Sequence, residues 1–170
     1  MKPNKTFRMI IFVILILANI GCDQISKSIA RKKLEPGKTI EIIDHNFILK
    51  RVENTGAFLG LGSGLNSKIR DVLFLWFPAI IIILLLIWFF KKNDLSIILI
   101  IALSFIIGGG IGNLYDRILF GSVTDFLHID LGIVRTGIFN LADVSVTVGV
   151  LILLIESFFA GKPEPDGEKQ

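Results

Sequence analysis

The sequence is poor in the residues that build disulfides and metal sites. Its 170 residues include one cysteine, Cys22, and two histidines, His45 and His128, which lie far apart in the chain. A single cysteine cannot form an internal disulfide, and the chain lacks the paired Cys and His spacing that is typical of a structural metal site. We therefore assign neither histidine a role and expect no metal ion.

Charge is scarce as well. Charged residues make up 19% of the chain and hydrophobic residues 52%, with a mean hydropathy of +0.72. This composition excludes an ordinary soluble domain and predicts a membrane protein. The net charge of +3 does not indicate nucleic acid binding, because the basic residues flank apolar segments, where they can contact lipid headgroups.

Four apolar segments are long enough to predict membrane helices: residues 7–22, 72–90, 95–114 and 138–159. Each is close to the roughly 20 residues that a helix needs to cross the hydrocarbon core. The connection FFKKNDLS is very short, so the second and third segments form a hairpin. We expect a single domain over residues 1–160, followed by a disordered tail at 161–170.

Residues 23–71, between the first two apolar segments, have their own order. The stretch DQISKSIARKKL places apolar residues at helical spacing among basic ones, which predicts a helix lying at the membrane interface. Pro36 and Gly37 end that helix, and the β-branched stretch TIEIIDHNFILKRV predicts one or two short strands. The predicted fold is an all-α membrane protein with four transmembrane helices, a small β-sheet and an interfacial helix.

Polar residues gather where the third apolar segment ends and the fourth begins. These stretches read GGGIGNLYDRILFGSVTDF and GIFNLADVSVTVG, and they place Asp125 and Asp143 near the same membrane face. Polar groups within membrane segments are uncommon and usually functional. Two carboxylates that meet in a low-dielectric site hold a single proton between them. An aspartic protease uses such a pair, in which one Asp takes a proton from water and the other protonates the developing oxyanion.

The same residues allow simpler interpretations. Asp125 also suits a loop or a helix cap, Asp116 suits a headgroup-level ion pair with Arg117, and the glycines suit helix packing. A small transporter or proton channel would also carry Asp and Asn in its membrane helices. Its polar residues should lie deeper and in several helices, whereas here the second apolar segment is wholly apolar. A simple membrane anchor would leave the polar cluster unexplained.

Five ordered motifs resemble those of the lipoprotein signal peptidases, also called signal peptidase II, which are aspartic peptidases of the bacterial cytoplasmic membrane. DQISK resembles the family's Asp-Gln-x-x-Lys, and ENTGAF resembles its Asn-x-Gly-Ala box. GGGIGNLYDR is similar to Gly-Gly-x-x-Gly-Asn-x-x-Asp-Arg, GSVTDF to Val-x-Asp-Phe, and FNLADVSV to Phe-Asn-x-Ala-Asp. Five such motifs in this order across residues 23–147 are highly specific.

The resemblance implies that Asp125 and Asp143 are the catalytic pair. It implies a prolipoprotein substrate that already bears diacylglycerol on its lipobox cysteine and is cut on the amino side of that cysteine. No metal, organic cofactor or nucleic acid is implied, and we expect a monomer surrounded by membrane lipids. The residues implied to shape the site or contact the substrate are Asp23, Lys27, Asn54, Gly56, Asn113, Arg117 and Asn140.

The resemblance also bears on topology. It implies the bacterial cytoplasmic (inner) membrane, with both termini in the cytoplasm and the site near the extracytoplasmic face. A literal count of basic residues would instead put the segment of residues 23–71 inside. We prefer the first topology because the basic residues of that segment are spread over a folded unit that also carries acidic residues.

Cys22 raises one further alternative, because LANIGC could end a cleaved lipoprotein signal peptide. A lipobox normally has an aliphatic residue three positions before its cysteine, where this chain has Asn19. A lipoprotein then continues as a flexible tether, whereas Asp23, Gln24 and Lys27 open a motif here. We therefore predict that Cys22 lies near the end of a retained helix.

Overall fold

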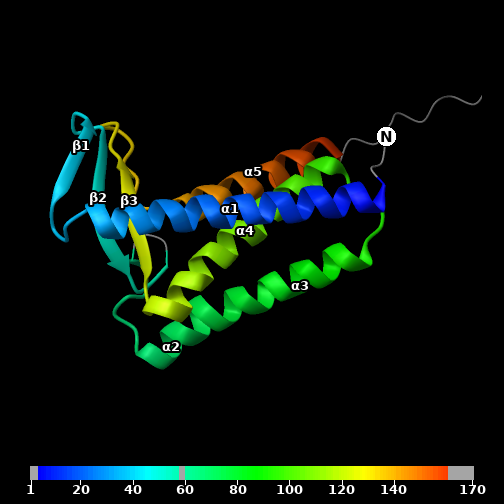
Figure 1. The fold of residues 1–170 in the computed structure, drawn as a ribbon, viewed down its shortest axis with the longest axis horizontal. Helices are drawn as coiled ribbons and strands as arrows, with labels where there is room; N and C mark the ends of the chain where they lie inside the picture. Colours follow the sequence, from blue (N-terminus) through cyan, green and yellow to red (C-terminus); the bar gives the residue numbers. More distant parts are fainter. Residues whose placement is uncertain (1–3, 58–59, 161–170) are drawn as a thin grey trace, which may run out of the picture.

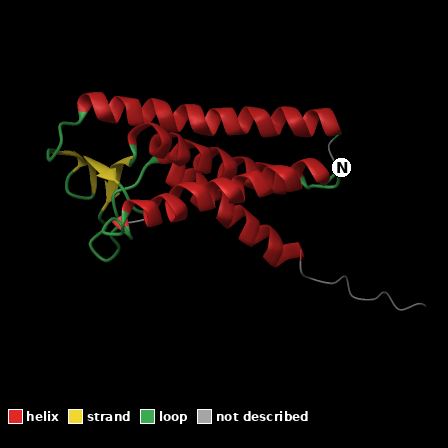
Figure 2. Ribbon diagram, turned by 90° about the horizontal axis from the view of Figure 1, so that it is seen from below, coloured by secondary structure: helices red, strands yellow, loops and turns green. Residues whose placement is uncertain are grey.

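Long helices form most of the molecule, and a small sheet covers one end of them (Figure 1). The computed structural model describes residues 4–57 and 60–160, so the expected tail at 161–170 lies outside the described residues, as does Phe58 of the ENTGAF motif. Figure 2 shows the same arrangement from below, with the strands again at one end of the helices. The helices are α1 (Lys5–Lys33), α2 (Ser67–Asp71), the π-helical turn Val72–Trp76, α3 (Phe77–Lys91), α4 (Ile97–Phe120) and α5 (Leu141–Ala160).

The predicted membrane helices are confirmed. Within the described part of the chain, 4 helical stretches are long and apolar enough to cross a membrane. They are Lys5–Lys33, Ser67–Lys91, Ile97–Phe120 and Leu141–Phe159. In the second stretch α2, the π-helical turn and α3 follow one another without a break.

The first helix is longer than we predicted. Residues 23–33 continue α1 instead of forming a separate helix at the interface. The sequence contains no proline or glycine between Cys22 and Lys33, so nothing in it breaks the helix before Pro36 and Gly37. Asp23 and Lys27 lie on this extension and face the protein interior, where they form an ion pair with each other. These two charged side chains therefore do not extend to the lipid headgroups.

The sheet contains three antiparallel strands in the order β1 (Thr39–Ile43), β2 (Phe47–Asn54) and β3 (Val123–Ile129). The first two lie in the stretch where we expected strands. We did not predict β3, whose residues pair with β2 in a register that sets Asp125 opposite Val52. The sheet packs on the end of α1 through Ala30, Leu34 and Phe126.

Glycines allow α4 to approach its neighbours very closely. A Cβ at Gly109 would lie 2.4 Å from the carbonyl oxygen of Ala142, and one at Gly149 would lie 2.7 Å from that of Ala102. Small residues permit such contact between membrane helices. The backbones of α4 and α5 therefore touch, and this contact places the start of α5 beside the end of α4.

Toward the opposite end the bundle has an apolar core, which is closed by Arg8. Phe12 of α1 stacks on Phe89 of α3 with ring centroids 3.7 Å apart. The buried guanidinium of Arg8 donates to the carbonyl oxygens of Lys92 and Asn93 in the turn after α3. This contact ties the α3–α4 turn to α1.

Replacing Gly109 by alanine should test the close contact between α4 and α5. Because the Ala142 carbonyl belongs to the backbone and cannot move aside, Gly109→Ala is expected to destabilise the protein by about 1–3 kcal/mol. Gly21→Ala is the matched control, since nothing lies within 4 Å of a Cβ at that helical position. Thermal unfolding in detergent measures both, and equal melting temperatures would contradict the contact.

Candidate active site

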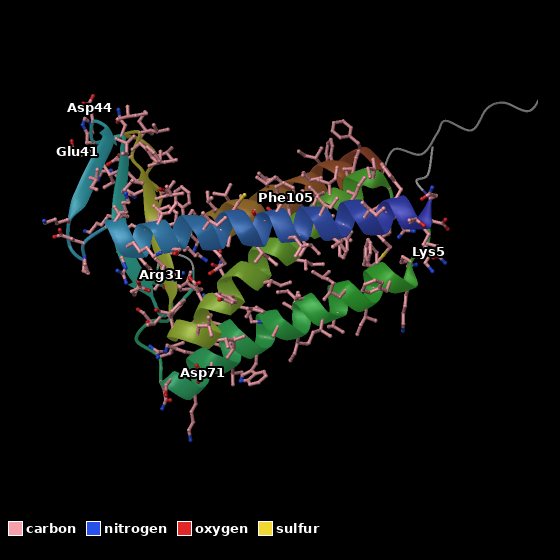
Figure 3. The ribbon with its side chains drawn as sticks, viewed as in Figure 1. Lys5, Arg31, Glu41, Asp44, Asp71 and Phe105 are labelled. Carbon is pink, nitrogen blue, oxygen red and sulfur yellow. The ribbon has the colours of Figure 1, made fainter. Side chains whose placement is uncertain are left out.

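The sheet end of the bundle brings together polar residues from five elements. Asp125 of β3 and Asp143 of α5 line one cavity of about 30 Å³. Asn54 of β2 and Arg117 of α4 line it as well. Figure 3 shows Arg31 of α1 at this end of the molecule and Lys5 at the other. The two carboxylates that the sequence places near one membrane face therefore meet in the folded chain.

Asp125 is 3% exposed and is held by two side-chain amides. The Nδ2 atom of Asn54 donates to Oδ2 of Asp125 at 2.9 Å, and that of Asn140 donates to Oδ1 at 2.6 Å. Burial, helped by the nearby charge of Asp143, raises the pKa of Asp125 to about 6. The two amide hydrogen bonds and the charge of Lys27 oppose this rise.

Asp143 is fixed by the cap of its own helix. Its backbone N–H donates to Oδ1 of Asn140 at 3.0 Å, while the Asn140 N–H donates to Oδ2 of Asp143 at 3.2 Å. This is the reciprocal arrangement of a capping box. Asn113 of α4 completes the environment by donating to Oδ1 of Asp143 at 2.8 Å. Asn140 thus contacts both carboxylates, one through its backbone and the other through its side chain.

A backbone connection places Asn140 beside Asp125. Phe139 pairs with β3: its N–H donates to the carbonyl oxygen of Leu127 at 2.8 Å, and its carbonyl oxygen accepts from the N–H of Phe126 at 3.0 Å. The chain enters α5 directly from this pairing. The sheet and the α5 cap are therefore parts of one unit, although Asp125 and Asp143 belong to different elements.

Lys27 sets the orientation of the Asn113 amide. Its Nζ donates to Oδ1 of Asn113 at 2.9 Å, and Asn140 donates to the same oxygen at 3.2 Å. An ammonium group can only donate, so it requires the amide oxygen to face it. The Asn113 NH₂ group is thereby left to donate to Asp143.

The ammonium of Lys27 lies in a buried ionic cluster. It is 2.8 Å from Oδ2 of Asp23 and 3.4 Å from Oδ2 of Asp116, and all three side chains are 0% exposed. Asp116 also pairs with Arg31 at 3.4 Å. The simpler interpretation of Asp116 as a headgroup-level partner of Arg117 is therefore wrong, because Asp116 is buried and its ion pairs are with α1.

Asp23 connects this cluster to the start of α5. Its Oδ1 accepts from the backbone N–H of Ala142 at 2.9 Å. A Cβ at Gly112 would lie 2.6 Å from its other oxygen, so a glycine is required at that position of α4. Gln24 donates to Asp116 at 3.1 Å and to the Gly112 carbonyl at 3.0 Å. We did not include Gln24 among the predicted site residues, although it belongs to the DQISK motif.

The turn after β2 closes another side of the site. Oδ1 of Asn54 accepts from the Gly56 N–H at 2.9 Å, and the Asn54 NH₂ group donates to the Ala57 carbonyl oxygen at 2.9 Å. Arg117 donates to the Gly56 carbonyl oxygen at 2.9 Å. A Cβ at Gly56 would lie 2.4 Å from the Leu61 carbonyl oxygen, which excludes any larger residue there.

Two larger cavities flank the carboxylates. One of about 320 Å³ is lined by Asp125 together with Asn54 and Ile138. The other, of about 300 Å³, lies between the helices and is lined by Asp143 together with Pro78 and Val146. Each carboxylate can thus be approached from a different side. Within residues 4–57 and 60–160, no group of three His, Cys, Asp or Glu side chains is placed to hold a metal ion.

Comparison with known proteins decides the family. Residues 14–159 match the model of the family described as signal peptidase (SPase) II. The chain belongs to the signal peptidase II family. It is 32% identical over 162 residues to the lipoprotein signal peptidase of Geobacillus thermodenitrificans, covering 95% of this chain and 98% of the relative. It is 36% identical over 151 residues to that of Clostridium novyi, covering 88% and 99%.

A solved structure agrees with this membership. A bacterial membrane enzyme determined by the in meso method at 2.3 Å resolution superposes with a TM-score of 0.79 and 28% identity, covering 99% of this chain and 98% of the other. The resemblance seen in the five motifs is confirmed. The protein is a multi-pass membrane protease of a bacterial family of lipoprotein signal peptidases.

Removing the Lys27 ammonium should test the buried ionic cluster. Lys27→Met leaves Asp23 and Asp116 buried with less compensating charge, and breaking one side of a buried pair costs about 3–5 kcal/mol. Lys38→Met is the matched control, because Lys38 pairs with Glu35 at the surface, where its side chain is 70% exposed. Chemical or thermal unfolding should show a large loss for the first variant and almost none for the second. Equal losses of unfolding free energy in the two variants would show that the buried ionic cluster does not contribute to stability.

Proposed function

We propose that this signal peptidase removes the signal peptide from diacylglyceryl-modified prolipoproteins by an aspartic mechanism. The cut falls on the amino side of the lipidated cysteine. The observation that carries the proposal is the meeting of Asp125 and Asp143 at one cavity, where each accepts hydrogen bonds from separate asparagine donors. The names of the relatives support the substrate class.

Asp125 is the better candidate to hold the shared proton. It lies outside the membrane helices on a buried strand, and burial beside Asp143 raises its pKa to about 6. Asp143 accepts hydrogen bonds from Asn113 and from the Asn140 backbone. Asp143 would then take a proton from the attacking water as that water adds to the scissile carbonyl carbon. Asp125 would donate its proton to the carbonyl oxygen as negative charge develops there.

The tetrahedral intermediate then collapses. The carbon–nitrogen bond breaks as the leaving nitrogen takes up the proton held by Asp143, and the carbonyl re-forms as one hydroxyl of the intermediate returns its proton to Asp125. The new amino terminus is that of the lipidated cysteine. Arg117 lines the same cavity and is fixed by the Gly56 carbonyl, so we assign it to site geometry and substrate contact. Asp23, Lys27, Asn54, Asn113 and Asn140 position these groups by the contacts described above.

The location of the dyad suits a lipid-anchored substrate. Asp125 and Asp143 lie where the helices meet the sheet, at one end of the apolar bundle (Figure 1). A peptide bond beside a lipidated cysteine lies near the membrane surface, where water is also present. We propose that the sheet end faces the extracytoplasmic side. The basic α3–α4 turn, with Lys91 and Lys92, would then lie in the cytoplasm together with both termini.

A transporter is less well supported. The middle and opposite end of the bundle contain an apolar cluster that includes Phe12, Phe89, Leu103 and Ile107. A proton or ion path would need polar groups along this depth. In the described part of the chain, the dense polar network lies at the sheet end.

Neutralising either carboxylate should abolish cleavage. Asp125→Asn and Asp143→Asn each remove a proton acceptor or donor, so we expect kcat to fall by about 10³-fold or more. The measurement is cleavage of a diacylglyceryl-modified prolipoprotein by purified protein, with unfolding curves to show that the variants fold. Asp44→Asn is the control, because Asp44 is an exposed carboxylate at the β1–β2 turn. Near-normal turnover by either dyad variant would remove that residue from the mechanism.

The proton on Asp125 predicts a pH dependence. The active form carries one proton on the dyad, and the pKa of Asp125 is about 6. As pH rises through that value, Asp125 ionises and kcat/KM for the free enzyme should fall about tenfold per pH unit. Below that value Asp125 keeps its proton, so kcat/KM should level off as the pH falls toward about 5. A kcat/KM that stays constant between about pH 5 and 8 would show that Asp125 does not hold the proton.

A further inference from the structure

Apolar side chains stand out from the sheet at a turn that takes no part in the site. Ile133 is 99% exposed, Leu131 66% and Val134 62%. Ile43, 61% exposed, begins the neighbouring β1–β2 turn, which is tied to this one because the Asp130 N–H donates to the Asn46 carbonyl at 2.8 Å. We call Ile43, Leu131, Ile133 and Val134 the apolar tip.

The exposure of the tip comes from a closed turn. The Leu131 N–H donates to the Val134 carbonyl oxygen at 2.9 Å, and Gly132 supplies the left-handed conformation, with φ of +77°, that the turn requires. Oδ1 of Asp130 accepts from the Gly132 N–H at 2.9 Å and from Nε of Arg135 at 3.0 Å. Asp130 and Arg135 therefore form an ion pair with each other. The backbone conformation of the turn directs the Ile133 side chain away from the protein.

The lipid-facing surface of α1 reaches almost to the sheet. Exposed apolar residues follow the helix from its first turns to the sheet: Phe7, Ile10, Val13, Ile14, Leu17, Ile25 and Ile29. At 1.5 Å per residue this stretch is about 33 Å long, close to the thickness of the hydrocarbon core. The edge of the hydrocarbon therefore lies near Ile29.

The sheet begins at that level. It packs on Ala30 and Leu34, directly beyond Ile29, through Phe126, Leu49 and Leu127. In Figure 1 the strands run across the helix axes instead of continuing them. Figure 3 shows that the end of the sheet with Glu41 and Asp44 extends past α1. This end carries the apolar tip, which therefore reaches sideways over the lipid that surrounds the bundle.

We propose that the apolar tip inserts into the lipid bilayer at the boundary between headgroups and acyl chains. An isolated cluster of exposed apolar side chains marks an interaction surface, and its position at the level where the exposed apolar residues of α1 end identifies lipid as its partner. The contact holds the sheet at a fixed height over the membrane. Because Asp125 lies on β3, it is held at that height as well.

Tryptophan fluorescence tests this contact directly. The chain has 2 tryptophans, Trp76 and Trp88, which are first replaced by phenylalanine. Ile133→Trp is then introduced at an almost fully exposed position, where the larger ring meets no neighbour. Lys38→Trp is the matched control, because it lies at the polar end of β1, opposite Ile43. Each protein is reconstituted in phosphatidylcholine vesicles with and without bromine on the upper acyl chains.

The expected result is a blue-shifted emission for Ile133→Trp and a loss of emission in brominated vesicles several-fold larger than for Lys38→Trp. Equal, weak quenching of the two variants by brominated lipid, with strong quenching by aqueous acrylamide, would overturn the proposal. Shielding of Ile133→Trp from both quenchers would also overturn it, because the tip would then be covered by protein. Melting temperatures matching the tryptophan-free background show that both variants fold. None of these readouts depends on catalysis, so the test is independent of the proposed function.

Discussion

The arrangement of the site depends on one buried ammonium group. The positive charge of Lys27 has to be compensated within the protein, because its side chain is buried. The compensating groups come from two helices: Asp23 from α1, and Asp116 and Asn113 from α4. Asp23 in turn caps the start of α5 through the Ala142 N–H. A charge that cannot reach water therefore orders three helices around itself. The carboxylates of Asp125 and Asp143 are arranged at the edge of this ordered region.

Close backbone packing allows this polar network to form. Gly112 leaves room for the Asp23 carboxylate, and Gly109 allows the backbones of α4 and α5 to touch. A side chain at either position would separate the helices and lengthen the hydrogen bonds between them. Each carboxylate then has its own amide donor: Asn54 donates to Asp125, and Asn113 donates to Asp143. Asn140 donates to both, through its side chain to Asp125 and through its backbone N–H to Asp143. The glycines of the third membrane segment thus combine the packing role with a role in the site.

The sequence predicted the membrane helices and the first two strands, and it named most of the polar residues that the structure gathers around Asp125 and Asp143. It failed at three places for physical reasons. The extension of α1 to Lys33 was mistaken for an interfacial helix, because its charges looked suited to headgroups when considered without their buried partners. Strand β3 was missed because its β propensity depends on pairing with β2, which is distant in the chain. The sequence left open a headgroup-level pairing of Asp116 with Arg117, its neighbour in sequence, whereas Lys27 and Arg31 are its neighbours in space.

By itself, the sequence determined that the chain is a four-helix membrane protein with polar residues concentrated at one end, because hydropathy and segment length are properties of the chain alone. Its five motifs also determined the family. Only the tertiary structure decided which groups contact each carboxylate, how Lys27 is compensated, and that the sheet carries Asp125. These features depend on contacts between residues far apart in the chain, and hydrogen bonds and ion pairs act over only a few ångströms.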